Sequence, residues 1–150
     1  MSRQASSRIV AIGVGCRAGV AGKAIAALAR RALEETGAPE GERQMFTLAA
    51  KADEPGLIEA ARIIGVALIA LPLAALNAQS ERILTPSAPA QARFGAPNIA
   101  EAAALAGAGE GGRLLGPRLA ADGATCAIAL SREQPCDGAT CAIALSGEQR

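Results

Sequence analysis

The stretch RIVAIGVGCRAGV, residues 8–20, decides the fold prediction. Its first half, Arg8–Val14, is apolar and rich in β-branched residues, which is typical of a buried strand. Gly13, Gly15 and Gly19 then predict a loop. From Val20 to Thr36 apolar residues recur at helical spacing, and glycine and proline follow directly. The stretch therefore predicts a strand, a glycine-rich loop and a helix in succession.

The same alternation continues along the chain. The pattern predicts further strands at Gln44–Ala49, Val66–Leu71, Arg113–Arg118 and Ala124–Leu130, and helices at Leu57–Ile64, from Pro72 to about Gln79, and at Ile99–Ala106. Glu81–Pro97, which contains three prolines, predicts a loop. The fold class expected is α/β: one layered domain with a mixed, largely parallel sheet flanked by helices. Residues 1–7 are expected to be disordered, 8–131 to form the domain and 132–150 to form a tail.

The tail contains a duplication. The sequence DGATCAIALS occupies residues 122–131 and recurs identically at 137–146. A single repeat with a period of 15 residues does not match a repeat architecture, which needs three or more longer units. We expect the first copy to form the terminal strand. The second copy is then a spare strand that adds at an edge, exchanges between protomers or aggregates.

Composition excludes several classes of function. The net charge of +1 gives no basic excess for nucleic acid, and the two phenylalanines cannot build a base-stacking surface. The chain has no histidine, which excludes Ser-His-Asp and Cys-His catalysis and histidine metal sites. The four cysteines include no CxxC pair, so no structural zinc site is expected, and nothing indicates another metal or a cofactor.

No segment predicts export or membrane insertion. The polar start lacks the apolar core of a signal peptide, and the apolar run Ile63–Leu76 is too short to span a bilayer. A reduced, cytoplasmic environment without disulfides is the expectation.

The glycine-rich segment is the first candidate site. Amide groups at a helix N-terminus attract anions, and glycine lets a ligand approach the backbone. The segment fails the Walker A pattern, since Ala24 follows Gly22-Lys23, and the dinucleotide pattern lacks its acidic partner. A tight turn without any ligand is equally consistent with it. Arg17 is a candidate clamp for a carboxylate or phosphate. Cys16 is either a nucleophile with a lowered pKa or, as we prefer, a small side chain packed under the loop.

A second group of candidates follows the second strand. The carboxyl ends of parallel strands line the ligand crevice of α/β sheets, so Lys51 is expected to face the same anion as Arg17. Asp53 is interpreted mainly as a helix cap, and Glu54 as an acid that favours the helix dipole. Asn98 with Glu101 is close to a capping box.

Taken together, these blocks resemble a known family. GVGCRAGV, KADEPGLIEAA, TPSAPAQARFGAPNIAEAAALAGAG and a terminal ATCAIAL strand occur in an order similar to that of the CobE family of cobalamin (vitamin B12) biosynthesis. This family is itself similar to the C-terminal domain of CbiG, the cobalt-precorrin-5A hydrolase. The resemblance covers about Ile9 to Leu130 and includes these candidate residues: Gly13, Gly15, Cys16, Arg17, Lys51, Asp53, Glu54, Ser87 and Glu101. The second tail copy has no counterpart in the family.

The resemblance implies a protein that binds a corrin or precorrin intermediate, a macrocycle with several carboxylates, as a carrier between pathway enzymes. An alternative is a hydrolase acting on a precorrin-5A-type lactone, with Asp53, Glu54 or Glu101 as acid or base. A third is an interaction module whose loop binds nothing. A net charge near zero also leaves self-association open. Corrin intermediates and other cobalamin-pathway enzymes are the expected partners, and nucleic acid and membranes are not.

Overall fold

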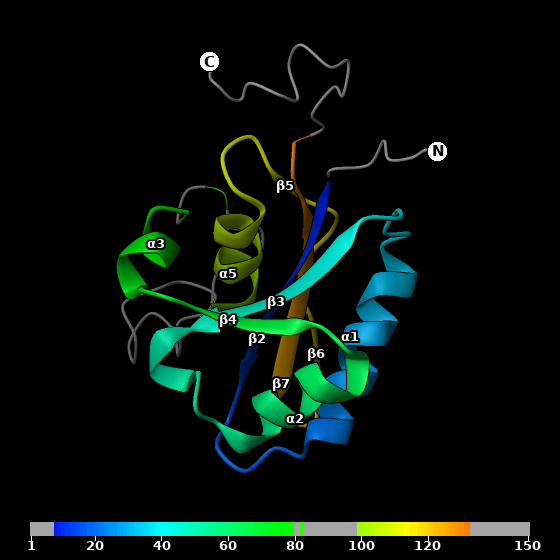
Figure 1. The fold of residues 1–150 in the computed structure, drawn as a ribbon, viewed down its shortest axis with the longest axis vertical. Coiled ribbons are helices and arrows are strands. Elements are labelled where there is room, and N and C mark those ends of the chain that lie inside the picture. The colour runs from blue at the N-terminus through cyan, green and yellow to red at the C-terminus, as the bar shows by residue number, and fades with distance from the viewer. Residues whose placement is uncertain (1–7, 80–81, 83–98, 133–150) are drawn as a thin grey trace.

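The computed structural model describes residues 8–79, 82 and 99–132. It is a mixed sheet with helices on both faces (Figure 1). In chain order the strands are β2 (Ile9–Cys16), β3 (Glu42–Leu48), β4 (Ala67–Leu71), β5 (Arg113–Leu114), β6 (Leu119–Ala121) and β7 (Ala124–Leu130). The helices are α1 (Gly22–Glu35), the 3₁₀ turn η1 (Ala49–Lys51), α2 (Pro55–Ile64), α3 (Leu73–Asn77) and α5 (Ile99–Ala108). The α/β class predicted from the sequence is confirmed.

The strand order across the sheet is β4-β3-β2-β7-β5, and β6 also pairs with β7. β2, β3 and β4 are parallel, whereas β7 is antiparallel to β2 and to both short strands. The parallel strands arise because helices connect them, with α1 between β2 and β3 and α2 between β3 and β4. Their carboxyl ends therefore meet at one edge of the sheet, which is where the candidate site lies.

Two apolar layers hold the helices to the sheet. One face carries large side chains, among them Ile12, Met45 and Ile128, and packs against α1 and α2. The other face is lined mainly by alanines and Phe46 and packs against α5. Small side chains on both surfaces allow α5 to approach the sheet closely, which explains how an alanine-rich chain builds a dense core.

Two of the expected loop glycines lie inside a strand. β2 continues to Cys16, so Gly13 and Gly15 are buried strand residues, and only Arg17–Ala21 forms the loop. A β-carbon at Gly13 would overlap the carbonyl oxygen of Ala100 in α5. Gly13 is thus needed because α5 crosses the strand at very short range. Periodicity along one segment of the sequence cannot reveal such a contact.

The last part of the domain also differs from the prediction. The strand expected at Arg113–Arg118 is only two residues long, and β6, which was not predicted, pairs with β7 through a two-residue hairpin. Asp122 and Gly123 form that turn with φ values of 55° and 85°. Asp-Gly is the preferred sequence for such a turn, because both positions need positive φ. The first copy of the duplicated sequence thus forms the hairpin turn and β7; the second copy lies outside the described residues.

Candidate functional site

The candidate site lies at the carboxyl ends of β2 and β3. Cys16 is the last residue of β2, and Lys51 ends the 3₁₀ turn that follows β3. The hydroxyl of Thr47 donates a buried hydrogen bond of 2.8 Å to the carbonyl oxygen of Val14, which ties the two strand ends together. The topology therefore brings together the first two sequence blocks, as expected from the parallel arrangement.

Glu54 connects these two strand ends through its carboxylate. Its Oε2 atom accepts a 2.9 Å hydrogen bond from the backbone N–H of Gly19, in the loop after β2. Its Oε1 atom lies 4.0 Å from Nζ of Lys51, and both side chains are only 15% exposed. A glutamate of the protein itself thus accepts the hydrogen bond of the loop amide and faces Lys51, at the place where we expected an external anion.

Asp53 does not serve as the predicted helix cap. The N-cap residue of α2 is Glu54, whose side chain makes no cap hydrogen bond, and Asp53 is exposed in the preceding turn. Pro55 occupies the first helical position, where its fixed φ suits the helix, so the cap falls one residue later than predicted. The Glu54 side chain is turned to Gly19 and therefore does not cap its own helix.

Cys16 is half-buried between these charged groups. Burial raises the pKa of its thiol above the ordinary value, while nearby Lys51 lowers it and Glu54 raises it. The alternative of a thiol activated by a lowered pKa is therefore wrong, and the packed thiol that we preferred agrees with the geometry. Cys16 is a free cysteine.

Arg17 lies on the other side of Cys16, toward β7. Its backbone N–H donates a 2.9 Å hydrogen bond to the carbonyl oxygen of Gly123 in the hairpin turn. Its aliphatic stem also borders this turn, since a β-carbon at Gly123 would be 3.6 Å from Cδ of Arg17. The residue is exposed, so its guanidinium group is available to a ligand.

The third sequence block reaches the same end of the sheet through α5. This helix begins beside Gly15, where a β-carbon would lie 3.4 Å from Cγ2 of Ile99. Glu101, in its first turn, is fully buried, and its Oε2 accepts a 2.9 Å hydrogen bond from the backbone N–H of Arg118. The carboxylate thus anchors the segment before β6, a role that the capping-box interpretation did not foresee. Asn98 and Ser87 lie outside the described residues.

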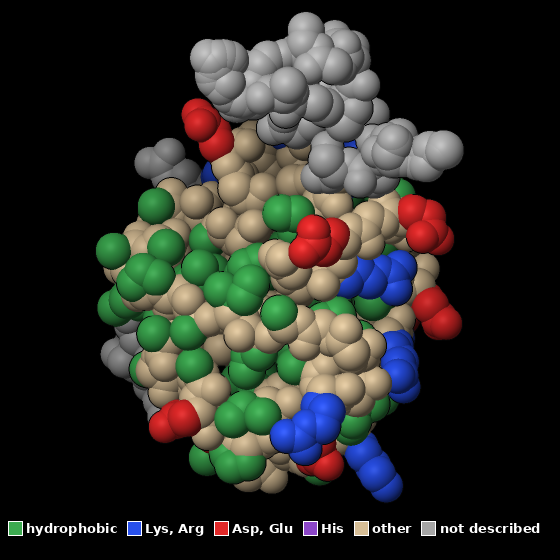
Figure 2. Space-filling model, in the orientation of Figure 1, with side chains coloured by type: hydrophobic (Ala, Val, Ile, Leu, Met, Phe, Trp, Pro, Cys, Tyr) green, Lys and Arg blue, Asp and Glu red, His purple; other side chains and the backbone are tan. Residues whose placement is uncertain are grey.

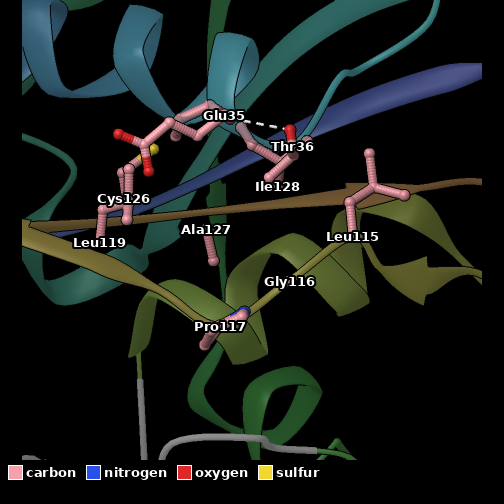
Figure 3. Close-up of a pocket in the computed structure, with 10 residues that line it drawn as sticks. Glu35, Thr36, Leu115, Gly116, Pro117, Leu119, Cys126, Ala127 and Ile128 are labelled. Carbon is pink, nitrogen blue, oxygen red and sulfur yellow. Dashed lines mark hydrogen bonds between the residues drawn. The ribbon is translucent and has the colours of Figure 1, made fainter.

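A separate cavity of about 220 Å³ lies between the end of α1, β7 and the segment before β6 (Figure 3). It is smaller than the usual range for ligand pockets, and no residue predicted as part of the site lines it. Its walls are mostly apolar, with Leu115, Leu119 and Ile128 among them, and the hydroxyl of Thr36 is already bonded to the carbonyl oxygen of Ala32 at 2.8 Å. Glu35 is the acidic group in its wall, which makes the cavity unsuitable for a polycarboxylate.

Residues 8–79, 82 and 99–132 contain neither a group of metal-ligating side chains nor a membrane-spanning helix. Within these ranges, no group of three or more histidine, cysteine or acidic residues is placed to hold a metal ion. Over the same residues, no helix has the length and apolar character needed to cross a membrane.

These features define a small α/β domain whose glycine loop and charged strand ends share one sheet edge. The chain matches the family described as "Cobalamin synthesis G C-terminus" over residues 10–129, and it belongs to that family. It is thereby a protein of cobalamin biosynthesis.

Relatives in sequence and in structure agree with this assignment. The chain is 34% identical over 119 residues to Protein CobE of Sinorhizobium sp. The aligned region covers 79% of this chain and 77% of the relative. The crystal structure of CobE, a protein from the cobalamin (vitamin B12) biosynthetic pathway, matches with a TM-score of 0.77 at 35% identity, over 83% of this chain and 92% of that one. The cobalamin biosynthesis protein chiG from Agrobacterium tumefaciens matches with a TM-score of 0.61 at 35% identity, over 81% and 98% of the two chains.

Proposed function

We propose that the protein binds a corrin or precorrin intermediate at the sheet edge formed by the ends of β2 and β3, and passes it between enzymes of the pathway. The observation that carries the proposal is Lys51, whose side chain is only 15% exposed and lies 4.0 Å from the Glu54 carboxylate, near enough to Cys16 to lower the pKa of its thiol. A partly buried cation attracts a carboxylate more strongly than an exposed one, because water screens it less. Corrin intermediates carry several carboxylates, which suit such a cation.

Two cations would then flank the ligand. Lys51 lies on the β3 side of Cys16, and Arg17 on the side of the β6–β7 turn. The guanidinium of Arg17 binds a carboxylate with two parallel hydrogen bonds, and the lysine acts as a point charge. In this proposal Asp53 sits on the exposed rim, Gly15 lets α5 begin close to the site, and Ser87 remains a candidate contact from the third block. The fully buried Glu101 acts only indirectly, by holding the backbone of Arg118.

Binding without turnover is the simpler proposal for the residues described. Cys16 is held as a thiol, both oxygens of Glu54 face groups of the protein, and the carboxylate of Glu101 receives a backbone N–H. Of the three candidate acids, Asp53 is the exposed one. A lactone hydrolase needs an acid or base free to exchange a proton with its substrate. The following experiment separates binding from hydrolysis.

The test is a visible-absorbance titration with hydrogenobyrinic acid, a metal-free corrin. We expect saturable binding by the natural chain, weakened roughly ten- to a hundredfold by Arg17→Ala if a charged hydrogen bond to a carboxylate is lost. Arg43→Ala is the matched control, because Arg43 is exposed near the opposite ends of the strands. Equal affinity of all three proteins overturns the placement of the site. Separately, a change in the mass of a precorrin lactone on incubation with the protein favours the hydrolase.

A further inference from the structure

The outer edge of β4 is an open side of the sheet. β4 pairs with β3 on its inner side, and within residues 8–79, 82 and 99–132 no strand pairs with it on the outer side. Its sequence, ALIAL, contains no charge and no proline. Protein edges are usually protected against further pairing by charges, prolines or bulges. β4 therefore presents backbone N–H and C=O groups that are suited to one more strand.

The surroundings of this edge are apolar. Figure 2 shows hydrophobic side chains gathered over β4 and α3, with charged side chains mainly along α1 and at the rim. The large apolar residues that the described structure leaves exposed are Ile58 and Ile63 of α2 and Leu73 of α3, at 42%, 38% and 38%. α2 contacts one face of the sheet and α3 accompanies α5 on the other, so apolar surface flanks β4 on both faces.

We propose that the second copy of the duplicated sequence, residues 137–146, adds to the β4 edge of its own chain as a parallel strand. The first copy demonstrates that this sequence forms a strand in this protein, since residues 124–130 of it are β7. β7 has β2 on one side and β5 and β6 on the other, so its place in the sheet is filled. Within the described residues, β4 offers an edge of five residues, whereas β5 and β6 at the other edge are only two and three residues long.

Loop length favours the first copy in the β7 position. Residues 122 and 123 close the β6–β7 hairpin, whereas placing the second copy there requires a connection of about 17 residues. The contacts within the sheet would be identical, and the longer loop costs on the order of 2 kcal/mol more in closure entropy. The second copy is thus left free for another strand position.

The chain leaves the sheet in a position to reach β4. Ala129 of β7 pairs with Ala11 of β2, Ala11 with Gln44 of β3, and Gln44 with Ala67, the first residue of β4. The end of β7 and the start of β4 are therefore level. Four strand spacings separate β7 from a strand outside β4, about 19 Å. The eight Cα–Cα steps from residue 131 to residue 139 span up to about 26 Å.

The direction and the side chains also fit. β7 runs opposite to β4, so a chain that crosses the sheet end and turns back runs parallel to β4. In β7 the larger side chains Cys126, Ile128 and Leu130 face α1, while Ala127 and Ala129 face α5. The second copy repeats this division of large and small side chains. Both of its faces are apolar, which suits an edge flanked by α2 on one face of the sheet and by α3 on the other, since both helices carry exposed apolar side chains.

Disulfide trapping tests the proposal on the full chain. Ala67 and Ala70 are exposed on β4 and three residues apart, so one faces each side of the sheet, and each is replaced by cysteine in a Cys136→Ser background. The native Cys141 of the second copy is the partner, with diamide as the oxidant. Ala120→Cys on β6, an exposed alanine at the opposite side of the sheet, is the matched control.

We expect an intrachain disulfide between Cys141 and one of the β4 cysteines, formed at least about tenfold faster than with the β6 cysteine. Peptide mass spectrometry identifies the pair, and Cys141→Ser abolishes it. Equal rates at β4 and β6, no product at β4, or products only between chains overturn the proposal. In a second measurement, we expect hydrogen exchange of the β4 amides to accelerate in Ala142→Pro, because proline removes a donor from the added strand. Unchanged exchange contradicts the proposal.

Discussion

The carboxylate of Glu54 and the backbone N–H of Gly19 are joined by a 2.9 Å hydrogen bond that spans 35 residues of sequence. The bond fixes the loop after β2 against the start of α2. The same carboxylate faces Lys51 at 4.0 Å. The protein therefore supplies a carboxylate of its own at the place where the proposed ligand would bring one.

Glu54→Gln tests this competition. The amide oxygen of glutamine can still accept the Gly19 hydrogen bond, but the negative charge beside Lys51 is gone. We expect hydrogenobyrinic acid to bind about three- to tenfold more tightly, because repulsion between carboxylates is removed. Titration by visible absorbance measures the change. Glu42→Gln, at the exposed start of β3, is the control that should leave the affinity unaltered. Weaker binding by Glu54→Gln shows instead that the carboxylate serves the ligand.

The reactivity of Cys16 should depend on the same pair. Burial raises the pKa of its thiol above the ordinary value of 9.0, Lys51 lowers it and Glu54 raises it. We therefore expect Lys51→Met to raise the pKa further and Glu54→Gln to lower it. The pH dependence of alkylation by iodoacetamide, followed on the peptide that contains Cys16, gives the midpoint. A midpoint below the ordinary value of 9.0 in the natural chain is the result that contradicts the proposed environment.

The sequence predicted well those features that depend on neighbouring residues. Local periodicity and turn chemistry predicted the strand at Arg8–Val14, which the structure has at Ile9–Cys16. They also predicted the helix before Gly37, Pro55 at a helix start and the terminal strand. The predicted pattern of parallel strands joined by helices also correctly placed Cys16 and Lys51 at one edge of the sheet. These inferences needed no knowledge of long-range contacts.

The errors concern contacts between distant segments. Gly13 was assigned to a loop, although the approach of Ala100 in α5 is what excludes a side chain there. The sequence also carried no sign that Glu54 bonds a loop 35 residues away or that Glu101 bonds the backbone of Arg118. Asp122-Gly123 did carry a usable signal, because Asp-Gly between apolar runs is typical of a hairpin, and that signal predicts the missed strand β6.

Gly13→Ala should destabilise the fold through this close approach. The added methyl group would overlap the α5 backbone at Ala100 and Ala104, and backbone atoms cannot move aside as a flexible side chain can. We expect the free energy of unfolding to fall by about 1–3 kcal/mol, the usual cost of overpacking a core. Urea denaturation measures this change in the free energy of unfolding.

Gly37→Ala is the control, because Gly37 has open space around it and a φ of 64°. Gly37→Ala should cost only its backbone strain, about 1 kcal/mol. A smaller loss at Gly13 than at Gly37 contradicts the packing argument.

The buried thiol of Cys126 should make stability fall at alkaline pH. Burial raises its pKa to about 12 in the folded chain, against 9.0 for an exposed thiol. Because the folded state holds its proton more tightly, the stabilisation is complete below pH 9 and is lost progressively between pH 9 and 12. At pH 10 this one group accounts for a loss of about 1.4 kcal/mol relative to neutral pH.

Cys126→Ala isolates that contribution. The variant loses some packing at every pH, so the informative quantity is the difference between its free energies of unfolding at pH 8 and pH 10, measured with urea. Cys16 lies in both proteins, and its raised pKa acts in the same direction in each. We therefore expect the natural chain to lose roughly 1.4 kcal/mol more than the variant over this interval. An equal decline in the two proteins means that the Cys126 thiol ionises in the folded state as readily as in the unfolded one, which its burial between β2 and β6 argues against.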